Sequence, residues 1–277
     1  MNLTTLLTRA RSLLTEPTAG FYSDTDLTGW ANDGLSIITG DTESIENVKT
    51  DSSVQYQQEY TLPTDCVKPT LVYWEDTPLD EIDWDEWLRK YSASNLADSG
   101  DPERFVAWNN KLYLHKIPSA SATTTTQTGN HTSTITSVVV ASTTGFPTIG
   151  KMKIGSETIA YTNTTATKFA GCSRGEEGST ATSHLASVTV TEKDITIVYY
   201  GQQTSDLSGT ATPSIPARYH ILIVYYMAWM GFLKAKEISL AREYGNMFSK
   251  GVAEMKRQLK LERYRYPIVK DRQMYGR

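Results

Sequence analysis

Apolar residues recur at helical spacing near the start of the chain, over residues 3–14 and again over residues 24–40. Ser23 and Asp26 stand three positions apart, which is the spacing of a capping box at a helix N-terminus. Gly40 is expected to end the second helix, because glycine readily adopts the left-handed conformation found at helix ends. The pattern therefore predicts an N-terminal helix pair.

Alternating and β-branched runs follow the helix pair and predict a small antiparallel sheet. Strands are expected over residues 54–62 and 67–74. The runs RFVAW and KLYLH flank Asn109 and Asn110, two residues that tolerate positive φ. These features predict a hairpin over residues 104–115 with a two-residue turn.

A short third helix is expected to open at Asp80. Leu79 would precede the cap and Trp84 would follow it by four residues, the arrangement of a hydrophobic staple. The acidic run over residues 76–86 lacks the glycine at the sixth position and the glutamate at the twelfth that an EF-hand calcium loop needs. Acids are favoured at a helix N-terminus without any cation.

The composition changes near residue 119. Residues 119–191 are rich in threonine, contain no tryptophan and show only short alternating runs, which predicts an inserted β module of four to six strands. The strand over residues 194–200 is expected to pair near residues 111–117, so that the chain leaves one strand and returns to its neighbour. We therefore predict an α+β protein with a host domain (1–118 and 192–277) and an inserted all-β domain.

The last third of the chain is predicted to be helical. Residues 221–233 are apolar on almost every side, so this helix must be buried on several sides, and contacts between subunits would supply that burial readily. A final helix from about Ile238 has an apolar stripe and a basic outer face. From Arg265 onward we expect an extended tail, because Pro267 blocks continuation of the helix.

Charge is distributed unevenly along the sequence. Residues 1–120 hold 9 Lys and Arg against 20 Asp and Glu, whereas residues 217–277 hold 13 against 5. This split indicates either a charge-complementary partner or neutralisation of the two ends within the fold, and both readings stay open. The N-terminus has no secretory signal pattern, and the longest apolar run is shorter than the about 20 residues of a membrane span. We expect a protein used without membrane insertion.

The residues that could carry chemistry are few. Cys66 and Cys172 form no CxxC pair, so both are expected to be free thiols. A Cys172–His184 dyad is imaginable, but it needs a depressed thiol pKa and an oriented base, and a small buried cysteine is the commoner situation. The histidines have no metal-binding spacing. No metal and no cofactor are expected.

The stretch from Lys153 to Ser179 is rich in glycine and charge. Gly155 and Ser156 suit a tight hairpin turn. Residues 174–178 (RGEEG) lack the GxxxxGK[ST] pattern and no helix is expected after them, so they predict a polar loop and not a phosphate site.

Three blocks of sequence follow one another in an order typical of one family. The chain opens with LTTLLTRARSLL and DTDLTGWANDGLSII, two short helices. It continues with EYTLPTDCVKPTLVYW and RFVAWNNKLYLHKIP, the strand and hairpin block. It then reaches PSIPARYHILIVYYMAWMGFLKAKEISLAREYGNMFSKGVAEMKRQ, a long helical pair followed by a basic tail. In this order the chain resembles the head-to-tail adaptor (connector) proteins of tailed bacteriophages. The insert, with FPTIGKMKIGSETIAYT and CSRGEEGSTATSHL, resembles small β modules of phage structural proteins and departs from the compact adaptor pattern.

The resemblance implies a structural protein without catalytic residues. It implies a helical adaptor core with a small antiparallel sheet, assembled in the host cytoplasm and placed in the neck or tail region of the virion. Such adaptors form a homo-oligomeric ring, commonly of twelve copies, that docks on the portal protein and supports tail or nozzle proteins. Genomic DNA passes through the channel without sequence-specific binding, and an acidic N-terminal region would repel its phosphates.

Two sets of contact residues follow from the resemblance and the pattern. The portal-binding set lies in the C-terminal segment and comprises Arg257, Lys260, Arg263, Tyr264, Arg265, Tyr266, Ile268, Val269, Arg272 and Tyr275. The subunit-interface set lies on the apolar helix and comprises Ile221, Tyr225, Tyr226, Trp229 and Phe232.

Two other functions compete with the adaptor reading. A receptor- or glycan-binding protein would use the β module as its head and would expose an aromatic cluster there, for which Phe146, Tyr161 and Phe169 are the candidates. A hydrolase acting on cell-wall material would use an acid such as Asp83 or Glu157.

Overall fold

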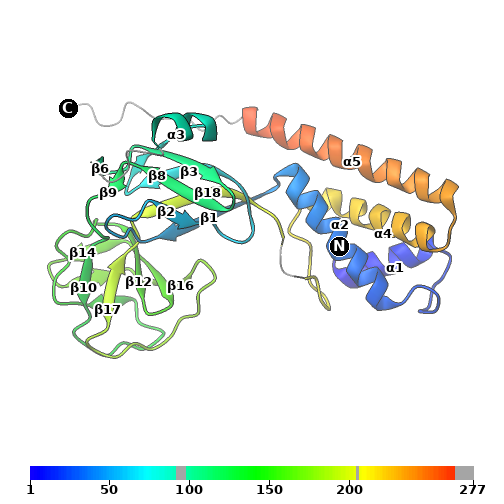
Figure 1. Ribbon diagram of the computed structural model, residues 1–277. Helices are drawn as coiled ribbons and strands as arrows, with labels where there is room; N and C mark the ends of the chain where they lie inside the picture. Colours follow the sequence, from blue (N-terminus) through cyan, green and yellow to red (C-terminus); the bar gives the residue numbers. More distant parts are fainter. Residues whose placement is uncertain (92–97, 204–205, 266–277) are drawn as a thin grey trace. The chain divides into compact units, whose positions relative to one another are not determined.

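The computed structural model describes residues 1–91, 98–203 and 206–265, with the backbone alone for residues 262–265. The fold is α+β and divides into two units (Figure 1). A helical unit comprises Met1–Glu46 and the chain from Tyr200 onward, and a β unit comprises Asn47–Tyr199. The α+β class predicted from the sequence is confirmed. The predicted boundaries at residues 119 and 191 are not tested by this division and stay a prediction.

The described helices of the helical unit agree with the apolar pattern. They are α1 (Leu3–Leu13), α2 (Asp24–Thr42), the 3₁₀ turn η1 (Ala217–Tyr219), α4 (His220–Lys234) and α5 (Ile238–Arg265). The capping box is confirmed, because Ser23 Oγ accepts from the Asp26 N–H at 3.0 Å and Asp26 Oδ2 accepts from the Ser23 N–H at 3.2 Å. The expected end at Gly40 is wrong. The helix continues to Thr42 and ends at Glu43, which adopts a left-handed φ of 52°.

Helix α4 is the centre of the helical unit. Its apolar side chains share one core with α1, α2 and α5, which includes Leu6, Leu35, Ile223, Met227 and Met255. Figure 1 shows α5 (orange to red) running alongside α4. The apolar helix predicted over residues 221–233 is therefore buried largely by the chain's own helices. In the described part of the chain, no helix is both long and apolar enough to cross a membrane.

Two four-stranded sheets form the host part of the β unit. The first has the order β1 (Ile45–Asp51), β18 (Ile195–Gly201), β3 (Cys66–Trp74) and β4 (Thr77–Pro78), and the second has the order β2 (Glu59–Thr61), β8 (Lys111–His115), β7 (Arg104–Trp108) and β5 (Asp80–Glu81). A two-stranded pair joins β6 (Ser99–Gly100) to β9 (Ile117–Pro118), and α3 is Trp84–Lys90. Side chains from both larger sheets share one apolar core, including Tyr60, Val72, Leu112 and Ile197.

The predicted hairpin is confirmed, and two neighbouring predictions are wrong. Asn109 and Asn110 have φ of 49° and 61° between β7 and β8. Residues 194–200 do not pair with residues 111–117, since both edges of β8 are occupied by β2 and β7, and β18 lies instead between β1 and β3. The expected strand over residues 54–62 is limited to β2.

The third helix begins later than the staple pattern predicts. Asp80 and Glu81 form a strand that pairs in parallel with β7. Asp83, not Asp80, caps α3, and its Oδ1 accepts from the Glu86 N–H at 2.7 Å. Strand pairing wins over local helix preference because β7 offers a free edge at this point.

The threonine-rich module has eight strands, more than the four to six expected. Its strands are β10 (Thr124–Thr126), β11 (Ser137–Val139), β12 (Gly150–Ile154), β13 (Glu157–Tyr161), β14 (Asn163–Thr165), β15 (Lys168–Ala170), β16 (Ser173–Glu176) and β17 (Thr189–Glu192). They form a five-stranded sheet, β10-β17-β12-β13-β16, and a three-stranded sheet, β11-β15-β14. The module has its own core around Met152, Ile159 and Phe169. Several strands are only three residues long, and a strand this short shows no recognisable alternation of apolar and polar residues in the sequence. The turn at Gly155, with φ of 61°, joins β12 to β13 as predicted.

Two glycines of α2 give a matched test of the packing of the helical unit. A Cβ at Gly34 would lie 2.9 Å from ring atoms of Tyr226 on α4, whereas a Cβ at Gly29 would meet no atom within 4 Å. We expect Gly34→Ala to lower the free energy of unfolding of the helical unit by about 1–3 kcal/mol, the usual cost of overpacking. Gly29→Ala should raise it by about 0.5–1 kcal/mol, because alanine loses less backbone entropy in a helix. Chemical denaturation followed by far-UV circular dichroism measures both, and equal effects of the two variants would contradict the close packing.

Candidate functional site

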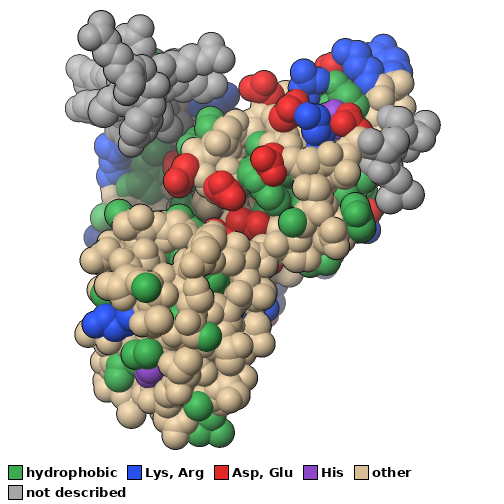
Figure 2. Space-filling view, turned by 90° about the vertical axis from the view of Figure 1, so that its left-hand side faces the viewer, with side chains coloured by type: hydrophobic (Ala, Val, Ile, Leu, Met, Phe, Trp, Pro, Cys, Tyr) green, Lys and Arg blue, Asp and Glu red, His purple; other side chains and the backbone are tan. Residues whose placement is uncertain are grey.

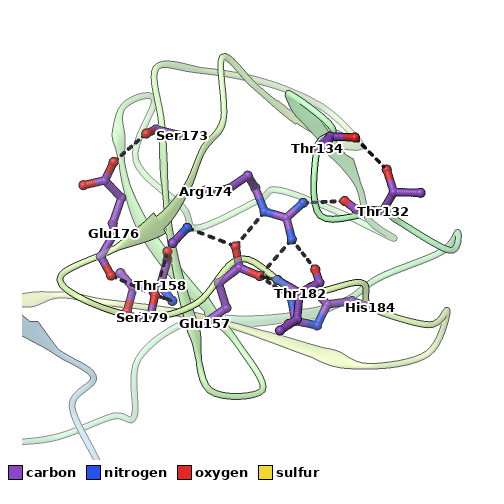
Figure 3. Close-up of polar contacts among 11 residues, drawn as sticks. Thr132, Thr134, Glu157, Thr158, Ser173, Arg174, Glu176, Ser179, Thr182 and His184 are labelled. Atoms are coloured by element: carbon purple, nitrogen blue, oxygen red, sulfur yellow. Dashed lines mark hydrogen bonds and ion pairs between the residues drawn. The ribbon is translucent and has the colours of Figure 1, made fainter.

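The most densely bonded polar group in the β unit is the carboxylate of Glu157, which is buried in the module (Figure 3). Arg174 donates from Nε to Oε1 at 2.7 Å and from Nη2 to Oε2 at 2.8 Å. His184 Nε2 lies 2.8 Å from Oε2. The guanidinium also donates to the carbonyl oxygens of Thr132 and Thr182, so it bridges separate loops. This bidentate geometry is the strongest form of side-chain ion pair.

Backbone amides complete the environment of Glu157. The N–H of Gly175 donates to Oε1 at 3.1 Å and the N–H of Thr182 to Oε2 at 3.0 Å. The glycine-containing loop after Arg174 therefore holds an internal carboxylate, in agreement with the expectation that it is not a phosphate site. Burial alone would raise the pKa of Glu157, but the hydrogen bonds from Arg174, Thr182 and His184 outweigh it and lower the pKa to about 2. Glu157 is thus ionised and fully bonded, which does not fit the general acid of a hydrolase.

The other candidate catalytic groups are also engaged structurally. Cys172 is buried, its Sγ donates to the Phe169 carbonyl oxygen at 3.7 Å, and burial raises its pKa. Since His184 is directed at Glu157, neither condition for a Cys172–His184 dyad is met. Asp83 caps α3. Among the described residues, no group of three His, Cys, Asp or Glu side chains could hold a metal ion.

A second buried carboxylate, Glu177, joins the module to strand β1. Lys151 of the module and Lys193, which directly follows β17, place their Nζ atoms 2.8 and 3.1 Å from its oxygens. From β1, Thr50 Oγ1 donates at 2.7 Å and Lys49 Nζ lies 3.8 Å away. Burial alone would raise the pKa of Glu177, but these donors lower it to about 2. Sequence reasoning missed this cluster, because Thr50 and Glu177 are 127 residues apart and the members share no motif.

A third group of acids lies where the chain leaves the module. Asp194 accepts from the N–H and the Oγ of Ser53 at 2.7 and 2.5 Å, and it lines a cavity of about 700 Å³ together with Glu192 and Glu75. Burial is the main cause that raises the pKa of Glu192 to about 7, and the charges of Asp194 and Glu75 add to it. The junction is therefore sensitive to pH near neutrality.

The three aromatic side chains of the module do not form a binding face. Phe146, Tyr161 and Phe169 are all buried, with exposed fractions of 9%, 1% and 0%. All residues from 119 to 191 are described, so the exposed aromatic cluster that would favour glycan binding by the module is absent there. Figure 2 shows few charged side chains on the visible face of the module, whereas acidic side chains gather on the rest of the β unit.

Exposed aromatic surface lies instead on the host part of the β unit. The rings of Trp84 and Trp108 are stacked, with centroids 5.1 Å apart and an interplanar angle of 8°. Trp84 is half-buried and Trp108 is 51% exposed. We call this pair the tryptophan platform. No local sequence pattern brings these residues together, since Trp84 begins α3 and Trp108 ends β7.

The predicted contact residues fall partly within the described chain. Arg257 and Lys260 are exposed on α5. Arg263, Tyr264 and Arg265 lie in the α5 backbone with side chains that are not described, and Tyr266, Ile268, Val269, Arg272 and Tyr275 lie outside the described residues. In the subunit-interface set, Tyr226 and Phe232 are buried, and Ile221, Tyr225 and Trp229 are half-buried against the chain's own helices. Both assignments stay predictions.

A cationic arc runs along the outer face of α5. It consists of the exposed residues Arg242, Asn246, Lys250, Ala253, Arg257 and Lys260, spaced three or four positions apart. Two acids, Glu243 and Glu254, lie beside the arc, and Glu254 pairs with Arg257 at 2.6 Å. The opposite face of α5 buries Ala241, Phe248, Val252 and Met255.

Removal of the Glu157 charge tests the buried pair. Glu157→Gln leaves Arg174 buried without its counter-charge, and we expect the free energy of unfolding of the module to fall by about 3 kcal/mol at pH 7. Hydrogen exchange of residues 119–191 should accelerate accordingly. Because folding lowers this pKa, wild-type stability from Glu157 is present above pH 4.5 and lost as the pH falls toward 2. Glu176→Gln is the matched control, as Glu176 bonds Ser173 near the surface. Equal exchange in both variants would show that the pair is dispensable.

The raised pKa of Glu192 predicts the opposite dependence on pH. Folding raises this pKa from 4.5 to about 7, so the stability contribution is present below pH 4.5 and is lost as the pH rises through 7. We expect Glu192→Gln to increase the free energy of unfolding by about 1–3 kcal/mol at pH 8.5 and to change it little at pH 5. Denaturation at the two pH values measures this, with the exposed Glu81→Gln as control. If Glu192→Gln lowers the free energy of unfolding at pH 8.5, the raised pKa of Glu192 is contradicted.

Comparison with known protein families gives a match over the N-terminal part of the chain. A model of the SU10 adaptor protein family matches residues 1–152, which hold α1, α2, the strands from β1 to β11, α3 and the start of β12. No curated protein sequence matches the chain. The family match covers more than half of the 277 residues and indicates a phage adaptor-type structural protein. The chain therefore belongs to the SU10 adaptor protein family.

Proposed function

We propose that the protein is a head-to-tail adaptor that forms a ring, docks on the portal, continues the DNA channel and provides the platform for tail attachment. The observation that carries the proposal is the family match over residues 1–152. The ring would have twelve copies, would occupy the virion neck and would be assembled in the host cytoplasm. Tail or nozzle proteins would bind on the side away from the portal.

Portal docking is assigned to the C-terminal segment from Arg257 to Arg277. Arg257 and Lys260 are exposed at the end of a long helix, so they can reach a partner without any change in the core. The sequence beyond them alternates arginine with tyrosine, and these residue types are enriched in protein interfaces.

Ring contacts can use the part of the helical unit that its own helices leave uncovered. Ile221, Tyr225 and Trp229 are half-buried, and Leu233 and Ile238 are 42% and 56% exposed. These apolar side chains would be covered by neighbouring copies. The burial of α4 within its own unit means that the chain can fold before the ring forms.

The proposed function includes no catalytic step. Glu157, Cys172 and Asp83 are each held by structural hydrogen bonds, and this supports a binding role over hydrolysis. The acidic composition of residues 1–120 would keep DNA phosphates from adhering to a channel wall. The hypothesis concerns repulsion only, and no sequence-specific contact with DNA is proposed.

Truncation tests the portal contact. We expect removal of residues 265–277 to abolish capture of the adaptor by its portal protein in co-expression, while far-UV circular dichroism and thermal unfolding stay like wild type. The reason is that these residues follow the packed part of α5, where Met255 is the last buried residue among the side chains that the structure describes. Native mass spectrometry of the portal complex provides the readout.

A matched control for the truncation is Lys153→Ser, which removes one exposed charge from the module and should leave capture intact. If the truncated chain is captured as well as wild type, the C-terminal docking assignment is wrong. If wild type itself is not captured, the adaptor proposal fails.

A further inference from the structure

We propose that the tryptophan platform of one copy binds the cationic arc on α5 of a neighbouring copy, through Arg242 and Lys250. This inference rests on the proposed function and deepens it by naming the two surfaces that meet in the ring. The platform belongs to the β unit and the arc belongs to the helical unit.

The platform is rigid enough to act as a preformed site. Trp84 stacks on Trp108 and also lies against Tyr113, with centroids 5.4 Å apart. Tyr113 in turn contacts Trp87, which is buried at 3% exposure. The helix that carries Trp84 is fixed by its Asp83 cap. Aromatic rings held in this way lose little entropy on binding, which favours their use as interface anchors.

Three exposed carboxylates lie on β5 and α3, the elements that neighbour or carry the platform. Asp80 and Glu81 lie in β5 beside β7, and Asp85 follows Trp84 in the first turn of α3. All three are exposed, and none forms an ion pair with any residue that the structure describes. By contrast, Glu86 is already paired with Lys90 at 2.6 Å. The surface therefore presents the exposed ring of Trp108, backed by Trp84, together with three carboxylates that form no ion pair with a described residue.

The N-terminal half of the cationic arc presents the complementary chemistry. Arg242 and Lys250 lie on the same face of α5, two turns apart, with Asn246 between them. Neither cation bonds a described residue, whereas Arg257 further along is paired with Glu254. The free cations at the start of the arc are thus available to a neighbouring copy, and the end of the arc is left to the portal.

Arginine and lysine meet different parts of the platform. A guanidinium stacks on a tryptophan face through cation–π attraction and still donates hydrogen bonds at its edge. A carboxylate beside the ring accepts those bonds, and a second carboxylate accepts from the lysine ammonium. A neutral glycan could stack on the same rings, but it would leave three carboxylates unmatched. The charge on the surface therefore favours a cationic protein segment.

The proposed contact has the symmetry that a ring requires. It joins two different surfaces of the same chain, which is a heterologous contact. A dimer formed through such a contact has a free platform at one end and a free arc at the other. Further copies can therefore add until the ring closes. An isologous contact would stop at a dimer.

Disulfide trapping between two variants that each carry one added cysteine tests the contact without any portal. Leu88→Cys introduces a thiol one turn after Trp84 at an exposed position, and Asn246→Cys introduces one between the two cations. The native thiols are poor competitors, since burial raises the pKa of Cys172 and raises that of Cys66 to about 11. On mild oxidation of an equal mixture we expect a linked heterodimer at least fivefold more abundant than with Lys153→Cys in place of Asn246→Cys.

Charge reversal in the same mixture distinguishes disulfides that form through the proposed contact from disulfides that form by random collision. Asp80→Lys with Asp85→Lys in the Leu88→Cys chain should reduce linking to the control level. Arg242→Glu with Lys250→Glu in the Asn246→Cys chain should do the same. When both reversed chains are mixed, linking should return. The inference is overturned if linking persists when only one of the two chains is charge-reversed. It is also overturned if linking does not return when both chains are reversed.

Two further outcomes are decisive. If Leu88→Cys and Asn246→Cys placed in one chain link only within monomers, the contact is intramolecular and the proposal is wrong. If a platform variant, Trp108→Ala, keeps its circular dichroism spectrum but links as well as the parent, the tryptophan pair is not the anchor. Portal capture is scored separately, so failure of the adaptor function would be seen there and failure of this contact only in the trapping.

Discussion

The ion pair between Glu157 and Arg174 is the constraint on which the loops of the threonine-rich module depend. It is buried, it is bidentate, and both partners use further bonds to hold loops that carry no regular structure. The same stretch of chain ends in Glu177, which reaches Lys49 and Thr50 of β1. The bonds of Glu157 therefore help to position Glu177, the carboxylate that binds the module to β1 of the host sheet.

A small module made of short strands has reason to rely on such pairs. Its apolar core is limited to ten buried side chains, and several of its strands have three residues. Removing one partner of a buried pair is costly because the other charge stays desolvated. Each pair consequently specifies one arrangement of its loops. Glu192 works in the opposite sense, since its raised pKa makes the junction less stable when the carboxyl ionises.

The two units expose surfaces of opposite character. The cationic arc of α5 and the tryptophan platform each lie on a packed scaffold, so neither needs rearrangement before it can bind. Family membership places such surfaces in an assembly protein. Under the proposed function, the charge asymmetry of the sequence would serve the recognition of one copy by the next and of a portal by the ring.

Local patterns in the sequence determined the helices, the capping box at Ser23, the hairpin turn at Asn109 and the free thiols, because each depends on residues a few positions apart. They failed at Asp80, where pairing with β7 overrode a helix signal, and at residues 194–200, whose neighbours are chosen by the whole sheet. The Glu157 and Glu177 clusters and the stack of Trp84 on Trp108 were decided by tertiary structure alone. Their members are distant along the chain, and only folding removes the water that would otherwise screen them from one another.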